Sequence, residues 1–182
     1  MGQHLKTQRG IGEFRRQGGG VHGCAVGIEG VRRPCPCGRR GCWERFASGS
    51  GLGRLAREAA EAGNGGRFLA LAGGDPEDVR GEHVTRAALE GDVAALNVFR
   101  EFGWWAALGI ANLVNVLDPE VVVVGGGLIG AGEVVLGPIR AAFPQLVLAA
   151  DHRPQVPIVP AQLGNDAGAI GAALIGFDHE RR

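Results

Sequence analysis

The sequence predicts a layered α/β fold, and three features support this prediction. A helical period of apolar residues extends from Asp92 to Leu117. A run of four valines, Val121–Val124, follows it, and a glycine-rich turn then leads into another helical segment. Helices that alternate with β-branched strands are typical of α/β layers, in which helices cover the sheet.

The first thirty residues differ from the rest of the chain. They show no helical period, and only residues 24–28 resemble a strand, so we expect an atypical, irregular segment over residues 1–30. No apolar stretch follows their charged residues, which argues against a signal peptide. The remaining residues, 31–182, are expected to form one lobe.

Two helices are predicted before the long one, over residues 45–62 and 82–90. Glycine and proline interrupt residues 63–81, so this stretch is predicted to be a loop. Asp92 supplies an N-cap for the long helix. That helix must end before Pro119, because the residue that precedes a proline disfavours helical backbone.

The second half of the chain continues the alternation. Val121–Val124 is expected to be a strand that is buried on both faces, as in a parallel sheet. Residues 125–132 are expected to turn into a helix that ends near Phe143. A short strand over residues 155–159 and a helix of small residues over residues 167–175 complete the predicted layer.

Composition argues against several classes of protein. The 182 residues carry 19 Lys plus Arg against 19 Asp plus Glu, so no overall basic charge attracts nucleic acid. No apolar run reaches the length of a membrane span. There is no Tyr and a single Lys, Lys6, which argues against a tyrosine acid, a Schiff-base lysine or a P-loop lysine. We expect a cytoplasmic protein that has no membrane partner.

All four cysteines lie close together in the sequence and suggest a metal site. Cys35, Cys37 and Cys42 form the pattern C-x-C-x4-C, which can deliver three thiolates to zinc from one loop. A fourth ligand must come from upstream, where Cys24 and His22 are both available. Nearby arginines are expected to lower the pKa of the thiols and so favour metal binding. These are Arg32, Arg33, Arg39 and Arg40.

Two other interpretations of the cysteine cluster remain open. A pair of disulfides is one, although adjacent C-x-C cysteines are difficult to bridge to each other. A nucleic-acid-binding zinc knuckle is the other, because arginines lie beside Trp43 and Phe46. The long α/β pattern that follows the cluster favours a structural zinc site within a larger domain.

The turn after the valine strand contains the pattern G-x-G-x-x-G at Gly125, Gly127 and Gly130. Such glycines let backbone amides approach a phosphate or a purine ring. A dinucleotide fold would place an acidic residue at the end of the next strand, but Asp151 precedes that strand. A nucleotide contact and a turn without a ligand therefore both remain open. Asn165 and Asp166 suggest a helix N-cap more than a general base.

Three segments resemble one family, the ROK family of sugar kinases and repressors, and within it the C-terminal half of the bacterial glucokinases. They read PCPCGRRGCWERFASGSGLGRLA, LDPEVVVVGGGLIGAGEVVLGPIR and AQLGNDAGAIGAALI, and they span about residues 31–176. The resemblance implies the C-terminal lobe of an actin-like ATPase (ribonuclease H-like) fold, with an inserted zinc loop at residues 35–44 and a nucleotide-side turn at residues 125–132. It also implies transfer of the γ-phosphate of ATP, with magnesium, to the 6-hydroxyl of glucose or a related hexose.

Individual residues match the family pattern. Glu44 resembles a glutamate that binds sugar hydroxyls. The structural zinc ligands match Cys35, Cys37 and Cys42, and the turn that packs against the nucleotide matches Gly125, Gly126 and Gly127. In place of the family's G-E-x-G-H element the chain has Gly23-Cys24-Ala25-Val26, which puts Cys24 at the position of the zinc histidine and leaves His22 two residues away.

The resemblance also leaves parts of the family pattern unmatched. Neither the D-x-G-G-T phosphate loop nor the Asn-Asp catalytic pair of the N-terminal lobe occurs in the expected context. We therefore expect a truncated form without that lobe, whose catalytic residues are unknown and which has little activity alone. The alternatives are the sugar-sensing half of a ROK transcriptional repressor, which would have a nucleic-acid partner, and a non-catalytic zinc-binding fragment. A homodimer would fit the long apolar helix.

Overall fold

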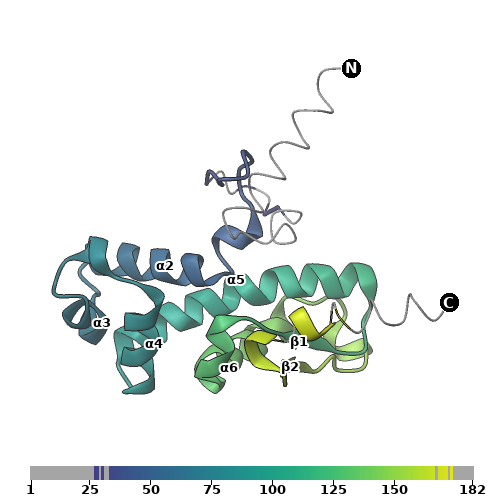
Figure 1. Cartoon of the computed structure of the whole chain (residues 1–182). Helices are drawn as coiled ribbons and strands as arrows, with labels where there is room; N and C mark the ends of the chain where they lie inside the picture. The colour runs from purple at the N-terminus through teal and green to yellow at the C-terminus, as the bar shows by residue number, and fades with distance from the viewer. Residues whose placement is uncertain (1–26, 29, 31–32, 167, 172, 174–182) are drawn as a thin grey trace.

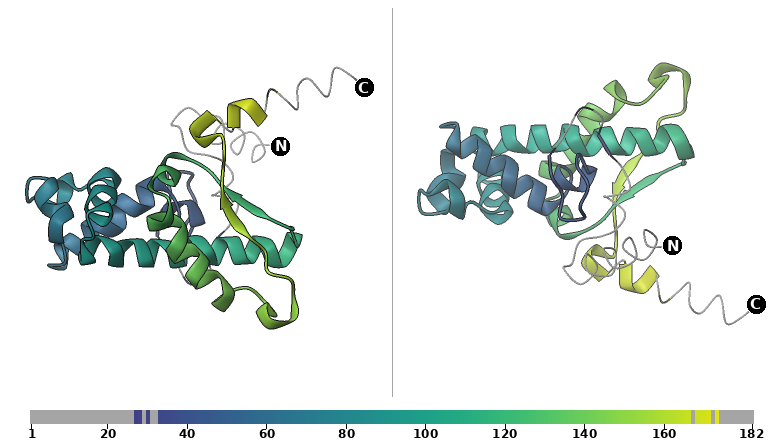
Figure 2. Two further views of the ribbon diagram at one scale, coloured as in Figure 1. Left: turned by 90° about the horizontal axis from the view of Figure 1, so that it is seen from below. Right: turned by 90° about the horizontal axis from the view of Figure 1, so that it is seen from above.

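The computed structural model describes residues 27, 28, 30, 33–166, 168–171 and 173. The molecule is organised around one long helix, α5 (Val93–Leu117). Figure 1 shows α2, α3 and α4 around the N-terminal half of α5, and α6 with both strands along its C-terminal half. The two views in Figure 2 show the same two groups at opposite ends of α5. None of the helices in the described part of the chain combines the length and the apolar character that a membrane crossing requires.

The helices α2 (Gly49–Glu61), α3 (Gly66–Leu71) and α4 (Gly81–Leu89) all contact α5. The predicted helices over residues 45–62 and 82–90 are thereby confirmed, although α2 starts later, after a 3-10 turn, η1 (Trp43–Arg45). The predicted loop over residues 63–81 is wrong in part, because it contains α3 and a 3-10 turn, η2 (Pro76–Asp78). The side chain of Phe68 is fully buried in the core, so tertiary packing stabilises this short helix among glycines.

Both ends of α5 lie where the sequence predicts them. Asp92 is the N-cap, and its Oδ1 accepts the backbone N–H of Ala95 at 2.8 Å. The helix ends at Leu117, and its C-cap, Asp118, takes a left-handed backbone conformation with φ 44° and directly precedes Pro119. These local signals fix the length of the central helix.

The described sheet has two parallel strands, β1 (Val122–Val124) and β2 (Ile158–Pro160), with Val122 paired to Ile158. The helix α6 (Glu133–Ala142) connects them and packs on α5 and β2. It follows a 3-10 turn, η3 (Gly127–Ala131), and a further one, η4 (Phe143–Gln145), ends it near Phe143 as predicted. The second strand begins three residues later than predicted. Residues 168–171 and 173 are helical, while the other positions of the predicted final helix, 167, 172, 174 and 175, lie outside the described residues.

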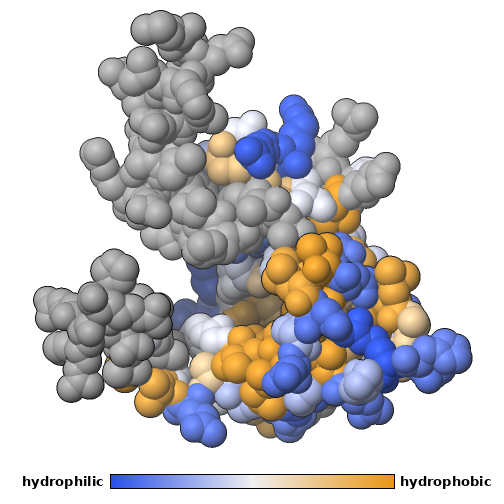
Figure 3. Space-filling view, turned by 90° about the vertical axis from the view of Figure 1, so that its right-hand side faces the viewer, coloured by the Kyte–Doolittle hydropathy of each residue, from blue (hydrophilic) through white to orange (hydrophobic). Residues whose placement is uncertain are grey.

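The prediction that the valine strand is buried on both faces is wrong. The side chain of Val123 is 60% exposed and that of Val121 is 45% exposed. Helices cover one face of the described sheet, and the opposite face remains open, so alternate valines reach solvent. Val116 and Leu117 at the end of α5 are also exposed. Figure 3 views the molecule from this end and shows apolar surface gathered there.

The segment that follows the cysteines is held against α5 by a close contact between η1 and that helix. The indole of Trp43 lies against the backbone of Gly109, and its Nε1 donates to the carbonyl oxygen of Trp105 at 2.8 Å. A Cβ atom at Gly109 would lie only 2.0 Å from Cε2 of Trp43. This contact therefore requires glycine at position 109.

We predict that Gly109→Ala destabilises the fold by about 1–3 kcal/mol, the usual cost of overpacking a close contact. The matched control is Gly137→Ala in α6, where the new Cβ would meet only Oε2 of Glu133, at 3.8 Å. That change should be neutral or stabilising by up to about 1 kcal/mol, because alanine favours helix. Urea unfolding followed by tryptophan fluorescence measures both. Equal effects of the two substitutions would contradict the role assigned to the Trp43 contact.

Candidate functional site

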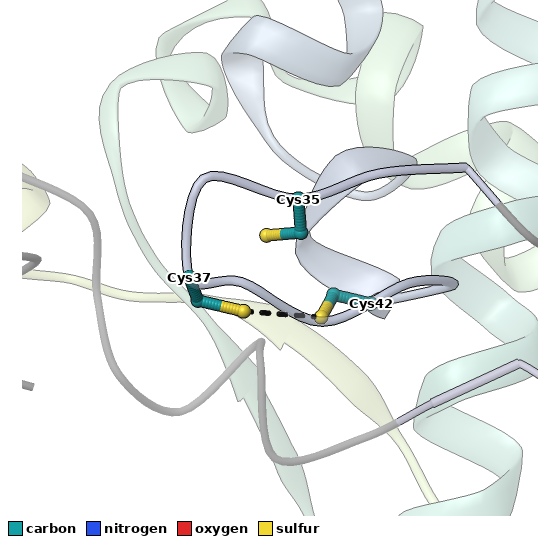
Figure 4. Close-up of side chains that lie close together, drawn as sticks. All are labelled: Cys35, Cys37 and Cys42. Atoms are coloured by element: carbon teal, nitrogen blue, oxygen red, sulfur yellow. Dashed lines mark hydrogen bonds between the residues drawn. The ribbon is translucent and has the colours of Figure 1, made fainter. Parts of the chain in front are cut away.

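Three cysteine side chains converge at one end of the described chain. The Sγ atoms of Cys35, Cys37 and Cys42 all lie within 4.8 Å of one another, and those of Cys37 and Cys42 are 3.5 Å apart. Figure 4 shows the three sulfur atoms turned toward a common point. Cys35 is 7% exposed and Cys42 is 2% exposed, whereas Cys37 is half-buried, so two of the three thiols are shielded from solvent.

Backbone pairing in the loop brings these sulfur atoms together. Antiparallel bridges join Pro34 to Arg40 and Gly27 to Cys42. Within the loop, the N–H of Cys35 donates to the carbonyl of Arg39 at 2.9 Å. Two glycines with positive φ, Gly38 at 88° and Gly41 at 70°, allow the chain to turn. The chain thus folds back on itself over a few residues and presents cysteines from both arms on one side.

The arrangement fits a tetrahedral metal ion that prefers sulfur ligands. With zinc–sulfur bonds of about 2.3 Å, sulfur atoms in a tetrahedron lie about 3.8 Å apart, close to the observed separation of Cys37 and Cys42. No disulfide joins any of the three described cysteines, so the alternative of disulfides among them is not observed. The two candidates for a fourth ligand, Cys24 and His22, lie outside the described residues.

The pKa of one cysteine, Cys42, differs from the expectation drawn from the sequence. Burial, followed by hydrogen bonds with Cys37 and Cys35, raises the pKa of Cys42 to about 12. The prediction that neighbouring arginines lower the pKa is therefore wrong for this thiol. One of those arginines, Arg33, instead pairs with Glu58 of α2 at 2.9 Å.

Glu44 lies in η1, two residues after the last cysteine of the cluster. Its side chain is half-buried, and this burial raises its pKa, while contacts with Ser48 and the charge of Arg45 act in the opposite direction. The hydroxyl of Ser48 also donates to the backbone carbonyl of Glu44 at 2.7 Å. Among the described residues, the carboxylate of Glu44 forms no ion pair, so it can accept hydrogen bonds from a ligand.

A cavity of about 310 Å³ joins the segment around Glu44 to the glycine turn. Trp43 and Ser48, on either side of Glu44, line it together with Gly125–Gly127. A neighbouring cavity of about 680 Å³ shares Gly127 and is also lined by α4. The glycine turn thus exposes backbone to two adjacent hollows, and Gly126 has a φ of 104°, which favours glycine. This surface can accept a ligand that needs backbone amide donors.

The structure brings together most of the residues that the sequence singles out. The three cysteines form one cluster, and Glu44 follows them on η1. Gly125, Gly126 and Gly127 share a cavity with Trp43 and Ser48, which flank Glu44, and no cysteine lines that cavity. Asp166 is exposed in the turn η6 (Gly164–Asp166), which contacts η3, but Asp166 is not part of this cavity lining.

Sequence reasoning missed two residues that build the site. Trp43 fixes η1 on α5, and its position directly after Cys42 gave no indication of a partner sixty residues away. Ser48 caps α2, where its Oγ accepts the N–H of Gly51 at 3.2 Å. A serine before a helical period is a recognised N-cap signal and could have been used.

Comparisons with known proteins give consistent relatives. A family model described as the ROK family matches residues 13–178. The glucokinase of Streptomyces coelicolor is 41% identical over 141 residues, which make up 76% of this chain and 44% of that protein. The xylose repressor of Bacillus spizizenii is 26% identical over 150 residues, which make up 80% of this chain and 33% of the repressor.

One solved structure is similar over most of the described fold. It is a ROK family glucokinase from Streptomyces griseus in complex with glucose and AMPPNP, with a TM-score of 0.77 and 39% identity. The match covers 82% of this chain and 49% of that one. It confirms the α/β fold with a small parallel sheet that belongs to the actin-like ATPase class. The chain spans less than half the length of both glucokinases.

We predict that Ser48→Ala lowers the free energy of unfolding by about 1 kcal/mol, because α2 loses its N-cap. The same change removes the hydrogen bond to the carbonyl of Glu44. Ser50→Ala is the control, since the Ser50 hydroxyl lies 2.9 Å from that of Ser48 and caps no backbone amide among the described residues. Thermal and urea unfolding compare the two, and a larger loss for Ser50→Ala would refute the capping role.

Proposed function

The chain belongs to the ROK family, and on that basis we propose that it forms part of a sugar kinase that transfers the γ-phosphate of ATP to the 6-hydroxyl of glucose or a related hexose. One observation carries the proposal: the segment around Glu44 and the glycine turn Gly125–Gly127 border the same cavity. A kinase needs a sugar and a nucleotide next to each other, so that the attacking hydroxyl meets the transferred phosphoryl group.

Glu44 is the proposed sugar ligand. A carboxylate has two oxygens that accept hydrogen bonds, which suits neighbouring hydroxyls of a hexose. Its half-buried position and its lack of an ion pair among the described residues support this role. Gly125, Gly126 and Gly127 are the proposed nucleotide contact, where backbone amides would donate to the phosphates of ATP, while magnesium would bind the phosphate oxygens.

Zinc is the proposed structural metal of the cysteine loop. Cys35, Cys37 and Cys42 would supply three thiolates, and Cys24 or His22 the fourth ligand. Bound zinc would hold the two arms of the loop together and so fix the start of η1. The convergence of the three sulfur atoms within 4.8 Å supports this assignment.

Catalysis also requires a general base to take the proton of the sugar hydroxyl. We assign no residue of this chain to that role, because none of the described carboxylates, Glu44 included, lines the cavity that Trp43 and Ser48 share with the glycine turn. We infer that the chain by itself turns over slowly or not at all. The setting for the complete reaction is expected to be the cytoplasm, and the exposed apolar end of α5 would suit a homodimer.

A second candidate function has support from the xylose repressor match, which covers 80% of this chain. In that case the same site would bind a sugar and would not phosphorylate it. Identity to the Streptomyces coelicolor glucokinase is higher, at 41% against 26%, which favours the kinase. Nucleotide binding distinguishes the two, since a sugar sensor has no need of ATP.

We predict that the purified chain contains about one zinc ion, measured by elemental mass spectrometry after dialysis. Cys37→Ser should remove most of this zinc, because three ligands hold the ion far less tightly than four. Cys24→Ser and His22→Ala, compared side by side, should identify the fourth ligand through the larger loss. A wild-type chain that purifies without zinc and does not bind it on titration would contradict the assignment.

We predict that the chain binds glucose and that Glu44→Gln raises the Kd at least about tenfold, as expected for the loss of a charge-assisted hydrogen bond. Calorimetric titration measures this, with the exposed Glu61→Gln as the control that leaves the Kd unchanged. Without a base, phosphoryl transfer from ATP to glucose should be about 10²–10⁴-fold below that of a typical kinase. Rapid turnover that survives Glu44→Gln would rule out the proposed sugar site.

A further inference from the structure

Among the described residues, Arg54 is the one charged side chain that is buried, at 8% exposure. Burial of a guanidinium is unfavourable unless its charge and its donors are satisfied. Arg54 lies on α2 and points toward the chain segment that leaves the cysteine loop. Because burial of this charge is unfavourable, its position suggests that Arg54 has a specific structural role.

The guanidinium of Arg54 reaches η1 with two of its donors. Nε and Nη2 both donate to the carbonyl oxygen of Arg45, at 3.4 Å and 3.3 Å. The Cζ atom also lies 5.0 Å from the centre of the Phe46 ring, whose other neighbour is Trp105 at 4.6 Å between centroids. Arg54 therefore fixes the peptide between Arg45 and Phe46, one peptide beyond Glu44.

Glu58 completes the arrangement from the same helix. One of its oxygens accepts from Nη1 of Arg54 at 2.6 Å, and the other lies 2.9 Å from Nη2 of Arg33. The carbonyl of Arg33 in turn accepts the N–H of Gly41, next to Cys42. Glu58 thus ties the arm that enters the cysteine loop to α2, while Arg54 ties the arm that leaves it.

We propose that Arg54, neutralised by Glu58, is a positioning residue that orders the η1 turn and presents Glu44 to the sugar. Because Glu58 serves as the counter-ion, Arg54 does not need the carboxylate of Glu44 and leaves it available for hydroxyl groups. The claim that Glu44 is presented to a sugar rests on the proposed function. The claim that Arg54 orders the η1 turn rests only on its hydrogen bonds to the carbonyl of Arg45.

Arg54→Lys tests the proposal, because lysine keeps the charge and can pair with Glu58 but cannot donate twice to one carbonyl in a fixed plane. Arg57→Lys is the matched control, since Arg57 lies on the same helix and donates to the carbonyl of Val79 instead. Two readouts are needed: the Kd for glucose, and hydrogen–deuterium exchange at the amides of Phe46 and Ala47. Both amides donate to the carbonyl of Trp43, at 2.9 Å and 3.0 Å, and so report on the turn.

For Arg54→Lys we expect exchange at these two amides to become about tenfold faster and the Kd for glucose to rise by a similar factor, as loss of a charge-assisted bond predicts. Zinc content and the exchange of α5 should stay as in the wild type, and Arg57→Lys should change neither readout. Unchanged exchange at Phe46 and Ala47 would overturn the proposal. Faster exchange with an unchanged Kd would overturn the sugar-presenting role.

The two hypotheses fail in different ways. If wild-type chain does not bind glucose at all, the proposed function fails, and the exchange data still decide whether Arg54 orders the turn. Glu58→Gln adds an independent check, because it leaves the charge of Arg54 without its counter-ion. We expect this variant to weaken glucose binding and to speed exchange at Phe46, whereas Glu61→Gln on the exposed end of α2 should do neither.

Discussion

The contact between Trp43 and Gly109 is the constraint on which the candidate site depends. The cysteines form a small cluster apart from the main core, and Trp43, together with Phe46 against Trp105, anchors the exit of their loop to α5. The indole can lie this close only because position 109 has no side chain. The hydrogen bond from Nε1 to Trp105 then fixes the rotation of the ring, and with it the direction in which η1 leaves the loop.

Polar side chains of α2 and its N-cap then fix the backbone of the turn that Trp43 anchors. Ser48 holds the carbonyl of Glu44, and Arg54 holds the carbonyl of Arg45, so two successive peptides of the turn are fixed by side chains from α2 and its cap. The arrangement leaves the Glu44 carboxylate outside every ion pair of the described residues. The three-residue turn η1 therefore connects the proposed metal site, which directly precedes it, to the cavity that Trp43 lines.

Local signals in the sequence were sufficient wherever structure is decided locally. Asp92 and Pro119 set the ends of α5, and the spacing of the cysteines predicted their convergence. Features that depend on residues far apart in the chain could not be predicted from the sequence. The helix around Phe68 forms because the core covers that ring, and Val123 is exposed because one face of the described sheet is not covered by helices. Likewise, nothing in the residues near Arg54 signals that a guanidinium would be buried there.

The central position of α5 has a consequence for how the protein unfolds. The helices around its N-terminal half and the strands with α6 along its C-terminal half both pack on one 25-residue helix, and their buried side chains belong to one hydrophobic core. Neither group can lose its packing without exposing a face of that helix, so the two halves are energetically coupled through α5. The protein should therefore melt in a single cooperative transition, with α5 acting as a shared spine and not as a linker between two independent subdomains.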